Sequence, residues 1–223
     1  MLKKQSIQLI VSLFFFIPLS ACVTTSEIQR TIEPQKTAVA ATPYYGPKTK
    51  VAVAGFENRS TYMNGVFSGK VDRIGNQART ILKTHLQQSQ RFQVLDRENL
   101  TAAAAESAYL GQGQEIKGAR YAITGDVSEF GRKAVGDRQL FGILGRGKQQ
   151  IAYAKVSLNV VDVLTSEIVY STQGAGEYAL KNREVVGFGA TAGYDQTLNG
   201  KVLDLAIREA VTNMANEFPT VVE

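Results

Sequence analysis

Cysteine and histidine are nearly missing from this chain. Its 223 residues contain one cysteine, Cys22, and one histidine, His85. A single cysteine cannot form an intrachain disulfide, and one residue of each type is too few for a zinc site of the usual ligand composition. A cysteine–histidine nucleophile pair would also require Cys22 to be a free thiol. These counts argue against metal chemistry and against covalent catalysis.

The sequence also lacks the loops that bind nucleotides and the motif that carries a serine nucleophile. The stretch GFGATAG (187–193) does not have G-x-G-x-x-G spacing, and GILGRGK (142–148) has no G-K-[ST]. No G-x-S-x-G sequence occurs. Carboxylate pairs such as Asp162 and Glu167 are interpreted as solvated turn residues rather than an acid–base pair. We therefore predict a protein that is not an enzyme and that uses no cofactor and no metal.

The first residues have the order typical of a secreted bacterial lipoprotein. Lys3 and Lys4 precede an apolar run that is shorter than the ~20 residues needed to span a bilayer. Leu19-Ser20-Ala21-Cys22 resembles a lipobox, in which the cysteine is acylated and becomes the first residue of the mature chain. We predict that residues 1–21 are a cleaved signal peptide and that Cys22 is lipidated. The alternative is an ordinary signal peptide followed by a chance cysteine.

The residue after the cysteine predicts the destination of the lipoprotein. Val23 does not resemble the aspartate of an inner-membrane retention signal, which favours an outer-membrane anchor with the domain facing the periplasm. Removal of Lys3 and Lys4 lowers the formal net charge from +5 to +3. That charge is mild, so we predict no nucleic-acid partner. Residues 22–48, rich in Thr, Ala and Pro, are interpreted as a lipidated tether.

Residues 49–223 fit one domain. Apolar periodicity predicts strands at 50–56, 91–96, 119–130, 149–163 and 168–180, and helices at 71–89, at 97–107 after an Asp96 cap, and at the C-terminus before Pro219. The order β-α-β-α-β-β-β-α predicts an α/β (α+β) sandwich with a mixed β-sheet flanked by helices. His85 lies at helical spacing from Leu82 and Leu86, and we interpret it as a packing residue rather than a catalytic one.

Two candidate β-hairpin arms, at 125–158 and 168–194, extend this domain. In the first, 125–135 would pair with 149–158; in the second, a polar turn at 181–184 would return the chain. Val186, Phe188 and Tyr194 share an apolar face of the second arm, a dyad pattern found in transmembrane β-hairpins. Open edges are not tolerated in lipid, so insertion would need several protomers. The alternative is an ordinary periplasmic sheet with long arms.

Five segments of the domain resemble sequences of the CsgG/HfaB family, the curli production assembly/transport lipoproteins. They are KVAVAGFENRS (50–60), ILKTHLQQSQRFQVLDRENL (81–100), GARYAITGDVSEF (118–130), VSLNVVDVLTSEIVYS (156–171) and GYDQTLNGKVLDLAIREAV (193–211). The fourth segment departs from the family pattern at Ser166, where that pattern has glycine. The resemblance covers about 50–218.

The resemblance implies a lipid-anchored periplasmic domain that forms a homo-oligomeric ring. In channel-forming members each protomer lends two hairpins to one outer-membrane barrel that exports unfolded fibre subunits without a nucleotide. The family's constriction loop corresponds here to 57–70, where Tyr62, Asn64 and Phe67 have matching residue types. Smaller members of the broad family have no shown pore, and some are similar to activators of cell-wall synthases.

Two functions are therefore expected. The first is a subunit of an oligomeric, nucleotide-independent secretion channel for a surface fibre or polymer, with secreted fibre subunits as partners. The second is a non-channel periplasmic interaction lipoprotein, which would bind accessory proteins in envelope assembly or activate a cell-wall synthase. Glycine-rich alternation favours the first function, and the shortness of the chain favours the second.

Overall fold

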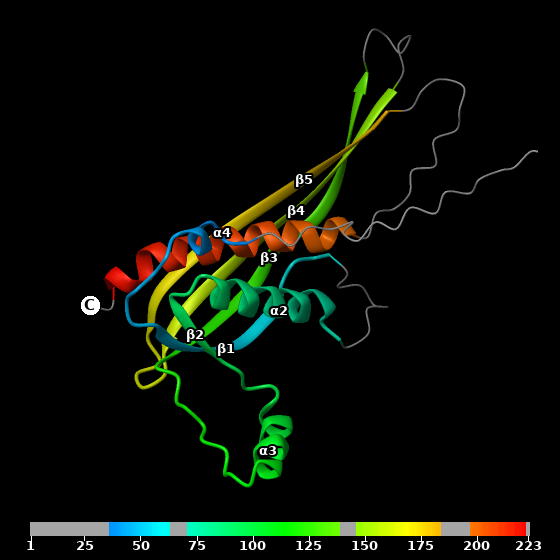
Figure 1. Ribbon diagram of the computed structural model, residues 1–223. Coiled ribbons are helices and arrows are strands. Elements are labelled where there is room, and N and C mark those ends of the chain that lie inside the picture. Colours follow the sequence, from blue (N-terminus) through cyan, green and yellow to red (C-terminus); the bar gives the residue numbers. More distant parts are fainter. Residues whose placement is uncertain (1–35, 63–70, 139–145, 184–196, 222–223) are drawn as a thin grey trace, which may run out of the picture. The chain divides into compact units, whose positions relative to one another are not determined.

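A computed structural model describes residues 36–62, 71–138, 146–183 and 197–221. Within these ranges the elements follow the predicted order of strands and helices (Figure 1). They are η1 (Ala38–Ala41, a 3-10 helix), β1 (Thr49–Asn58), α2 (Arg73–Gln88), β2 (Phe92–Leu95), α3 (Leu100–Tyr109), β3 (Tyr121–Arg138), β4 (Arg146–Asp162), β5 (Ile168–Arg183) and α4 (Thr197–Val221). The predicted mixed α/β fold is confirmed.

The five strands form one mixed sheet in the order β2-β1-β3-β4-β5. β1 is parallel to both neighbours, because crossover segments with helices connect the chain from β1 to β2 and from β2 to β3. β3, β4 and β5 are antiparallel neighbours. The pairing expected between 125–135 and 149–158 is present, with Gly125 opposite Leu158 and Val135 opposite Gln149.

The hydrophobic core lies between the sheet and the two helices α2 and α4. Alternate residues of β4, from Ala152 to Val160, are buried beneath the helices. The apolar stripe of α4 that the sequence indicated is fully buried: Leu203, Ile207, Ala210, Met214 and Phe218. Truncating one such large side chain to alanine is expected to cost about 2–5 kcal/mol. The helical layer therefore determines the stability of this part of the sheet.

Two glycines allow α4 to lie directly on the backbone of β5. A Cβ atom at Gly174 would lie 2.6 Å from the Ala210 nitrogen, and one at Gly176 would lie 2.5 Å from the Val202 carbonyl oxygen. The free edge of β5 is also covered by α4: the Ala175 N–H donates to Glu209 Oε2 over 2.7 Å. Asn213 Nδ2 donates to the Gln173 carbonyl over 3.3 Å. Backbone groups of an edge strand that are bonded in this way are not available to another strand.

These contacts correct the second predicted arm. Residues 181–183 are not a turn, because β5 continues through them and pairs with β4 at 147–149. A strand returning along the whole of 168–180 would also meet the edge that α4 occupies at Gln173 and Ala175. Val186, Phe188 and Tyr194 lie outside the described residues, so their place in a hairpin stays a prediction.

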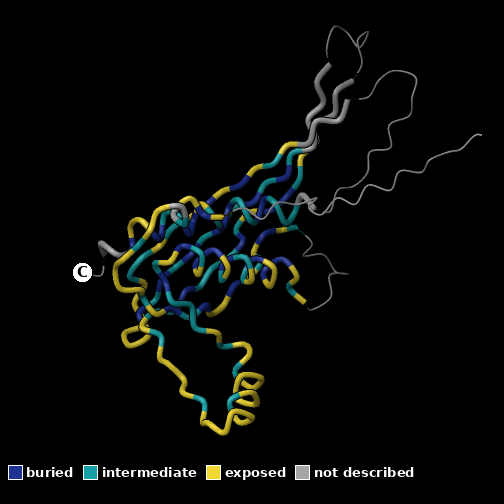
Figure 2. The backbone as a smooth tube through the Cα atoms, in the orientation of Figure 1, coloured by how far each residue is buried: buried dark blue, intermediate teal, exposed yellow. Residues whose placement is uncertain are grey.

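Two predicted helix boundaries are also wrong. α4 continues two residues past Pro219 to Val221, because a proline in the last turn removes only one hydrogen bond. α3 begins at Leu100 and not after Asp96, and its N-cap residue is Asn99. The Asp96 carboxylate instead accepts the Glu98 N–H over 3.0 Å, a local turn of the kind aspartate favours. No residue of α3 is buried (Figure 2).

Candidate interaction site at the root of the arm

β3, β4 and β5 continue beyond α2 and α4 as a three-stranded arm (Figure 1). The first turn of α4 marks where this arm begins: Arg132 Nη2 and Nε donate to Asn199 Oδ1 over 2.7 and 3.1 Å. We call residues 132–138, 146–152 and 177–183 the distal arm, since the register pairs them with one another. Strand residues up to Phe130 that precede it belong to the helix-covered body.

Tyr62 lies at the root of the arm and packs on Phe130 of β3. The two ring centroids are 4.9 Å apart with an interplanar angle of 58°. Asn58 fixes the chain before the ring: its Oδ1 accepts from the Ser60 hydroxyl over 2.6 Å, and its Nδ2 donates to the Tyr62 carbonyl over 3.1 Å. Of the constriction-loop candidates only Tyr62 is described, and it lies as a packing anchor; Asn64 and Phe67 lie outside the described residues.

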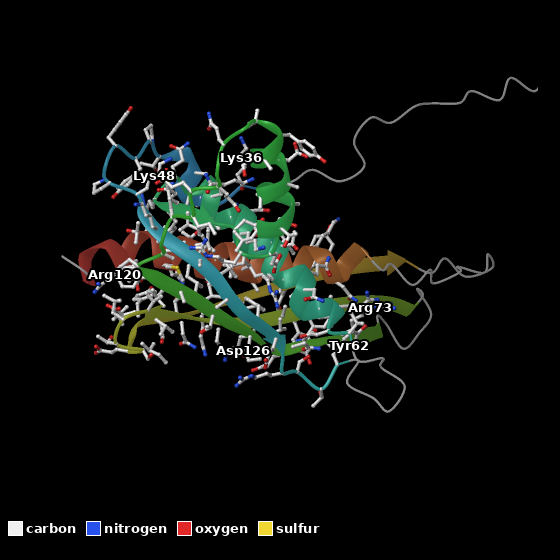
Figure 3. The ribbon with its side chains drawn as sticks, turned by 90° about the horizontal axis from the view of Figure 1, so that it is seen from below. Lys36, Lys48, Tyr62, Arg73, Arg120 and Asp126 are labelled. Carbon is white, nitrogen blue, oxygen red and sulfur yellow. The ribbon has the colours of Figure 1, made fainter. Side chains whose placement is uncertain are left out.

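One carboxylate closes the base of this loop. Asp72 is the N-cap of α2, and its Oδ1 accepts the Gly75 N–H over 2.7 Å. Its Oδ2 accepts the Asn58 N–H from the end of β1, also over 2.7 Å. Figure 3 shows Tyr62 and Arg73 near each other at the end of the sheet from which the arm extends. The loop 59–72 is therefore held at both ends beside the arm root.

On the face of the sheet opposite α2 and α4, the arm root is bridged by an aromatic ring. A Cβ atom at Gly131 would lie 2.6 Å from the Tyr153 hydroxyl, so the glycine leaves room for this ring. Lys133 Nζ lies 5.8 Å from the ring centroid and 3.9 Å from Glu177 Oε1. These contacts tie three neighbouring strands together where the helical cover ends.

His85 belongs to the interior of the body and not to an active site. It is 2% exposed, and its Nε2 lies 2.8 Å from Asp204 Oδ1, which links α2 to α4. The packing role expected for His85 fits this burial. Among the described residues no group of three or more His, Cys, Asp or Glu could hold a metal ion.

Asp162 is not a solvated turn residue, as the sequence suggested, because it organises the β4–β5 turn. It is buried, and it accepts from Arg120 Nη2 over 2.6 Å and from the Leu164 N–H over 2.8 Å. Ser166 in this turn has φ +61°, a left-handed conformation in which glycine is preferred. The substitution at the position of the family's glycine thus retains the backbone shape at some cost in strain.

Charged groups on the helical side shift three pKa values. Hydrogen bonds from Lys83 and Arg79 lower the pKa of Glu98, and a hydrogen bond from Asn99 lowers that of Asp96. Burial, with the Glu217 carboxylate second, raises the pKa of Tyr170 to about 12. The first two groups tie α2 to the α3 segment, and the third lies against α4, away from the arm.

The sequence did not reveal a band of positive charge on the distal arm. Its 21 residues include seven Lys or Arg and two acidic residues. The basic residues are Arg132, Lys133, Arg138, Arg146, Lys148, Lys181 and Arg183. Their positions in the chain are separated by up to 50 residues, and only the register of the three strands brings them together. Lys181 and Arg183 in particular were expected in a turn.

Comparison with known proteins identifies the family. A family model described as "Curli production assembly/transport component CsgG" matches residues 35–222. The chain belongs to the CsgG family. A CsgG-family relative, "Putative lipoprotein NMB1126/NMB1164" of Neisseria meningitidis serogroup B (strain ATCC BAA-335 / MC58), is 61% identical over 198 residues, which are 89% of this chain and 88% of the relative.

Solved structures share the fold of this CsgG-family chain only distantly. A PelC dodecamer from Paraburkholderia phytofirmans is 17% identical with a TM-score of 0.36, covering 76% of this chain and 91% of that one. Lipoprotein GNA1162 from Neisseria meningitidis is 11% identical with the same TM-score of 0.36, covering 77% and 99%. Within the described ranges, no helix of this CsgG-family member has the length and apolar character to cross a membrane.

Proposed function

We propose that this chain is a lipoprotein of the bacterial outer membrane, anchored through acylated Cys22, whose α/β domain faces the periplasm as an interaction module in envelope assembly. The Leu19–Cys22 lipobox and the name of the 61% identical relative support the lipid anchor. Membership of the CsgG family supports an assembly or transport role. Several acyl chains anchor a protein firmly, because each buried methylene contributes ~0.8 kcal/mol.

The charge on both faces of the distal arm favours the module over a channel. Arg138 and its partner Arg146 lie on one face by register, and Lys133 and Asp137 alternate onto the other. A strand of a transmembrane barrel needs one apolar face, and an Arg or Lys near the bilayer midplane costs about 2–4 kcal/mol. The described part of the β3–β4 hairpin offers no such face. A domain with this arm is better suited to contacts outside the hydrocarbon layer.

The partners of this module would be other copies of the chain and envelope accessory proteins, including cell-wall synthases. Tyr62, Phe130 and Tyr153 place three aromatic rings where loop 59–72, β3 and β4 meet. The lipid tether at 22–48 would let the domain reach a partner away from the membrane.

A second candidate is a subunit of an oligomeric, nucleotide-independent secretion channel for a fibre or polymer. The observation that favours it is the continuation of β3, β4 and β5 beyond the helical layer (Figure 1). In this alternative Val186, Phe188 and Tyr194 would face lipid, and Tyr62, Asn64 and Phe67 would narrow the pore in a ring of copies.

Purification of the full chain from membranes in mild detergent tests the two candidates. Mass spectrometry of the mature N-terminus should find an acylated Cys22, and an unmodified residue would contradict the anchor. We expect the purified protein to leave planar bilayers non-conducting. Large heat-labile rings that conduct ions would instead support the channel.

A pair of substitutions sharpens this test. Phe188→Asp should abolish membrane assembly if the residue faces lipid, whereas Thr191→Asp, on the alternate positions of the same stretch, is the matched control. The module predicts that both variants reach the membrane fraction as the wild type does. Selective loss of Phe188→Asp would contradict it.

A further inference from the structure

Positive charge in this protein is concentrated on the distal arm. The arm carries five more basic than acidic residues, whereas the mature chain as a whole carries a net charge of only +3. The rest of the mature chain is therefore slightly acidic, with a net charge of −2. A charge distribution of this kind directs one end of a molecule toward an anionic surface.

The strand register places this charge in one band around the arm. Arg138 lies opposite Arg146 at the last described pair of β3 and β4. Lys148 lies opposite both Gly136 and Asn182, and Arg183 lies opposite Gly147. All four basic residues thus fall within two or three residues of the same end of the strands, and Lys181 lies beside them opposite Gln149.

The basic residues occur on both faces of the arm. Arg138, Arg146 and Lys148 share one face by alternation, and Lys181, Arg183 and Lys133 fall on the other. A folded partner that docks on one side of a sheet would contact only one of these sets. A layer of anionic groups that surrounds the end of the arm would contact both.

We propose that the distal arm binds end-on to an anionic phospholipid surface, with its Lys and Arg residues among the phosphate headgroups. Lys and Arg near an anionic membrane each add to binding and lose this contribution as salt screens them. The connection 139–145 lies outside the described residues and is not part of the surface argued here. The inference rests neither on lipidation nor on the choice between module and channel.

Vesicle co-sedimentation of the full chain carrying Cys22→Ser tests the proposal, because no acyl anchor can form in that variant. Vesicles of phosphatidylcholine alone measure binding by the apolar leader. Vesicles with about 30% phosphatidylglycerol should bind at least about 10-fold more tightly, and raising NaCl from 0.1 to 0.5 M should remove that gain. Equal binding to both vesicles, or a gain that salt does not reduce, would overturn the proposal.

A charge-matched pair of variants locates the effect. The arm variant combines Arg138→Gln, Arg146→Gln, Lys148→Gln, Lys181→Gln and Arg183→Gln. The body variant combines substitutions at five exposed basic residues: Lys36→Gln, Lys48→Gln, Lys50→Gln, Arg73→Gln and Lys117→Gln. Each charge removed from the arm should weaken binding about fivefold, so the arm variant should lose the phosphatidylglycerol-dependent gain and the body variant should keep most of it. Equal losses would contradict a site on the arm.

A third variant protects the test against misfolding and against another partner. Arg138→Lys, Arg146→Lys and Arg183→Lys together preserve the charge, so binding should stay within about threefold of the Cys22→Ser background. Loss of binding in this variant, with the unfolding transition unchanged, would overturn headgroup binding. Capture by soluble dextran sulfate without any preference for phosphatidylglycerol vesicles would assign the arm to a soluble polyanion and would likewise reject the proposal.

Discussion

The part of the sheet beneath α4 and the distal arm are made from the same three strands but from different residues. Beneath the helix, alternate residues of β4 are apolar and fully buried, and glycines of β5 let α4 lie on the backbone. In the arm the same strands keep their backbone pairing but carry basic residues on both faces. Backbone pairing alone therefore does not determine composition; what covers the strand does.

This difference teaches where stability and function are separated in the molecule. A buried apolar side chain contributes about 1.5–3 kcal/mol, whereas an exposed charge contributes little to folding. Residues of the arm are consequently free to match what lies outside the protein. The comparison predicts large stability effects in the body, intermediate effects at the arm root and almost none in the arm.

The largest expected effect comes from filling the space between β5 and α4. Gly174→Val would push a branched side chain into the backbone of Ala206 and Ala210, and we expect a loss of about 3 kcal/mol or more in the free energy of unfolding. The matched control is Ala175→Val, whose side chain is on the exposed face of β5. Urea denaturation measures both. A small loss at Gly174 would mean that α4 does not pack on the strand.

The buried link between α2 and α4 should have the next largest effect. Asp204→Ala removes the acceptor that lies 2.8 Å from the buried His85 Nε2, and leaving such a group without its partner costs about 1–3 kcal/mol. Asp204→Asn retains an oxygen at this position and should recover at least half of the loss. Equal destabilisation by Ala and Asn would show that the ring is not held by this contact.

The base of the loop at the arm root provides an intermediate case. Asp72→Ala removes both the N-cap of α2 and the acceptor for the Asn58 N–H, and we expect a loss of about 1–2 kcal/mol. Asp72→Asn, which can still accept one of these bonds, should lose less. Thermal unfolding followed by circular dichroism measures the change. An effect below about 0.5 kcal/mol would mean that the loop is not fixed at this end.

The body should also lose stability at alkaline pH through Tyr170. Its pKa is raised to about 12 by burial and by Glu217, while an unfolded tyrosine has a pKa of about 10. The contribution of Tyr170 is thus fully present below pH 10 and is lost as pH rises toward 12. Because the side chain is partly exposed, we expect about 1 kcal/mol. Tyr170→Phe should remove this loss in denaturation at pH 9 and 11.5, and Tyr45→Phe should not.

Much of the body could be predicted from the sequence, because burial imposes periodicity. Every residue used to predict the C-terminal helix, from Leu203 to Phe218, is fully buried. The first hairpin pairing followed from the alternation at 149–158. The turn at 181–184 was wrong because Lys181 and Arg183 are polar in a strand that no helix covers. Polar strands beyond a core have no apolar period by which they can be recognised.

The candidate site was less predictable for a related reason. Tyr62 was recognised as a loop aromatic, but its partner Phe130 is 68 residues further along the chain and no local pattern connects the two. The basic band depends on register between three strands, and register is set by pairing across the sheet. A net charge of +3 for the mature chain also hid the band, because the body offsets it with acidic residues.

The smallest expected stability effect is in the arm itself, and it tests the comparison most directly. Removing five charges from residues that pair only through their backbone should change the free energy of unfolding by less than about 0.5 kcal/mol, since surface substitutions rarely do more. Relief of like-charge repulsion between Arg138 and Arg146, which lie opposite each other, would even stabilise slightly. Urea denaturation of the five-residue arm variant and of the body variant provides the measurement. A loss above about 2 kcal/mol would mean that the arm charges are structural and that arm and body are not separate in function.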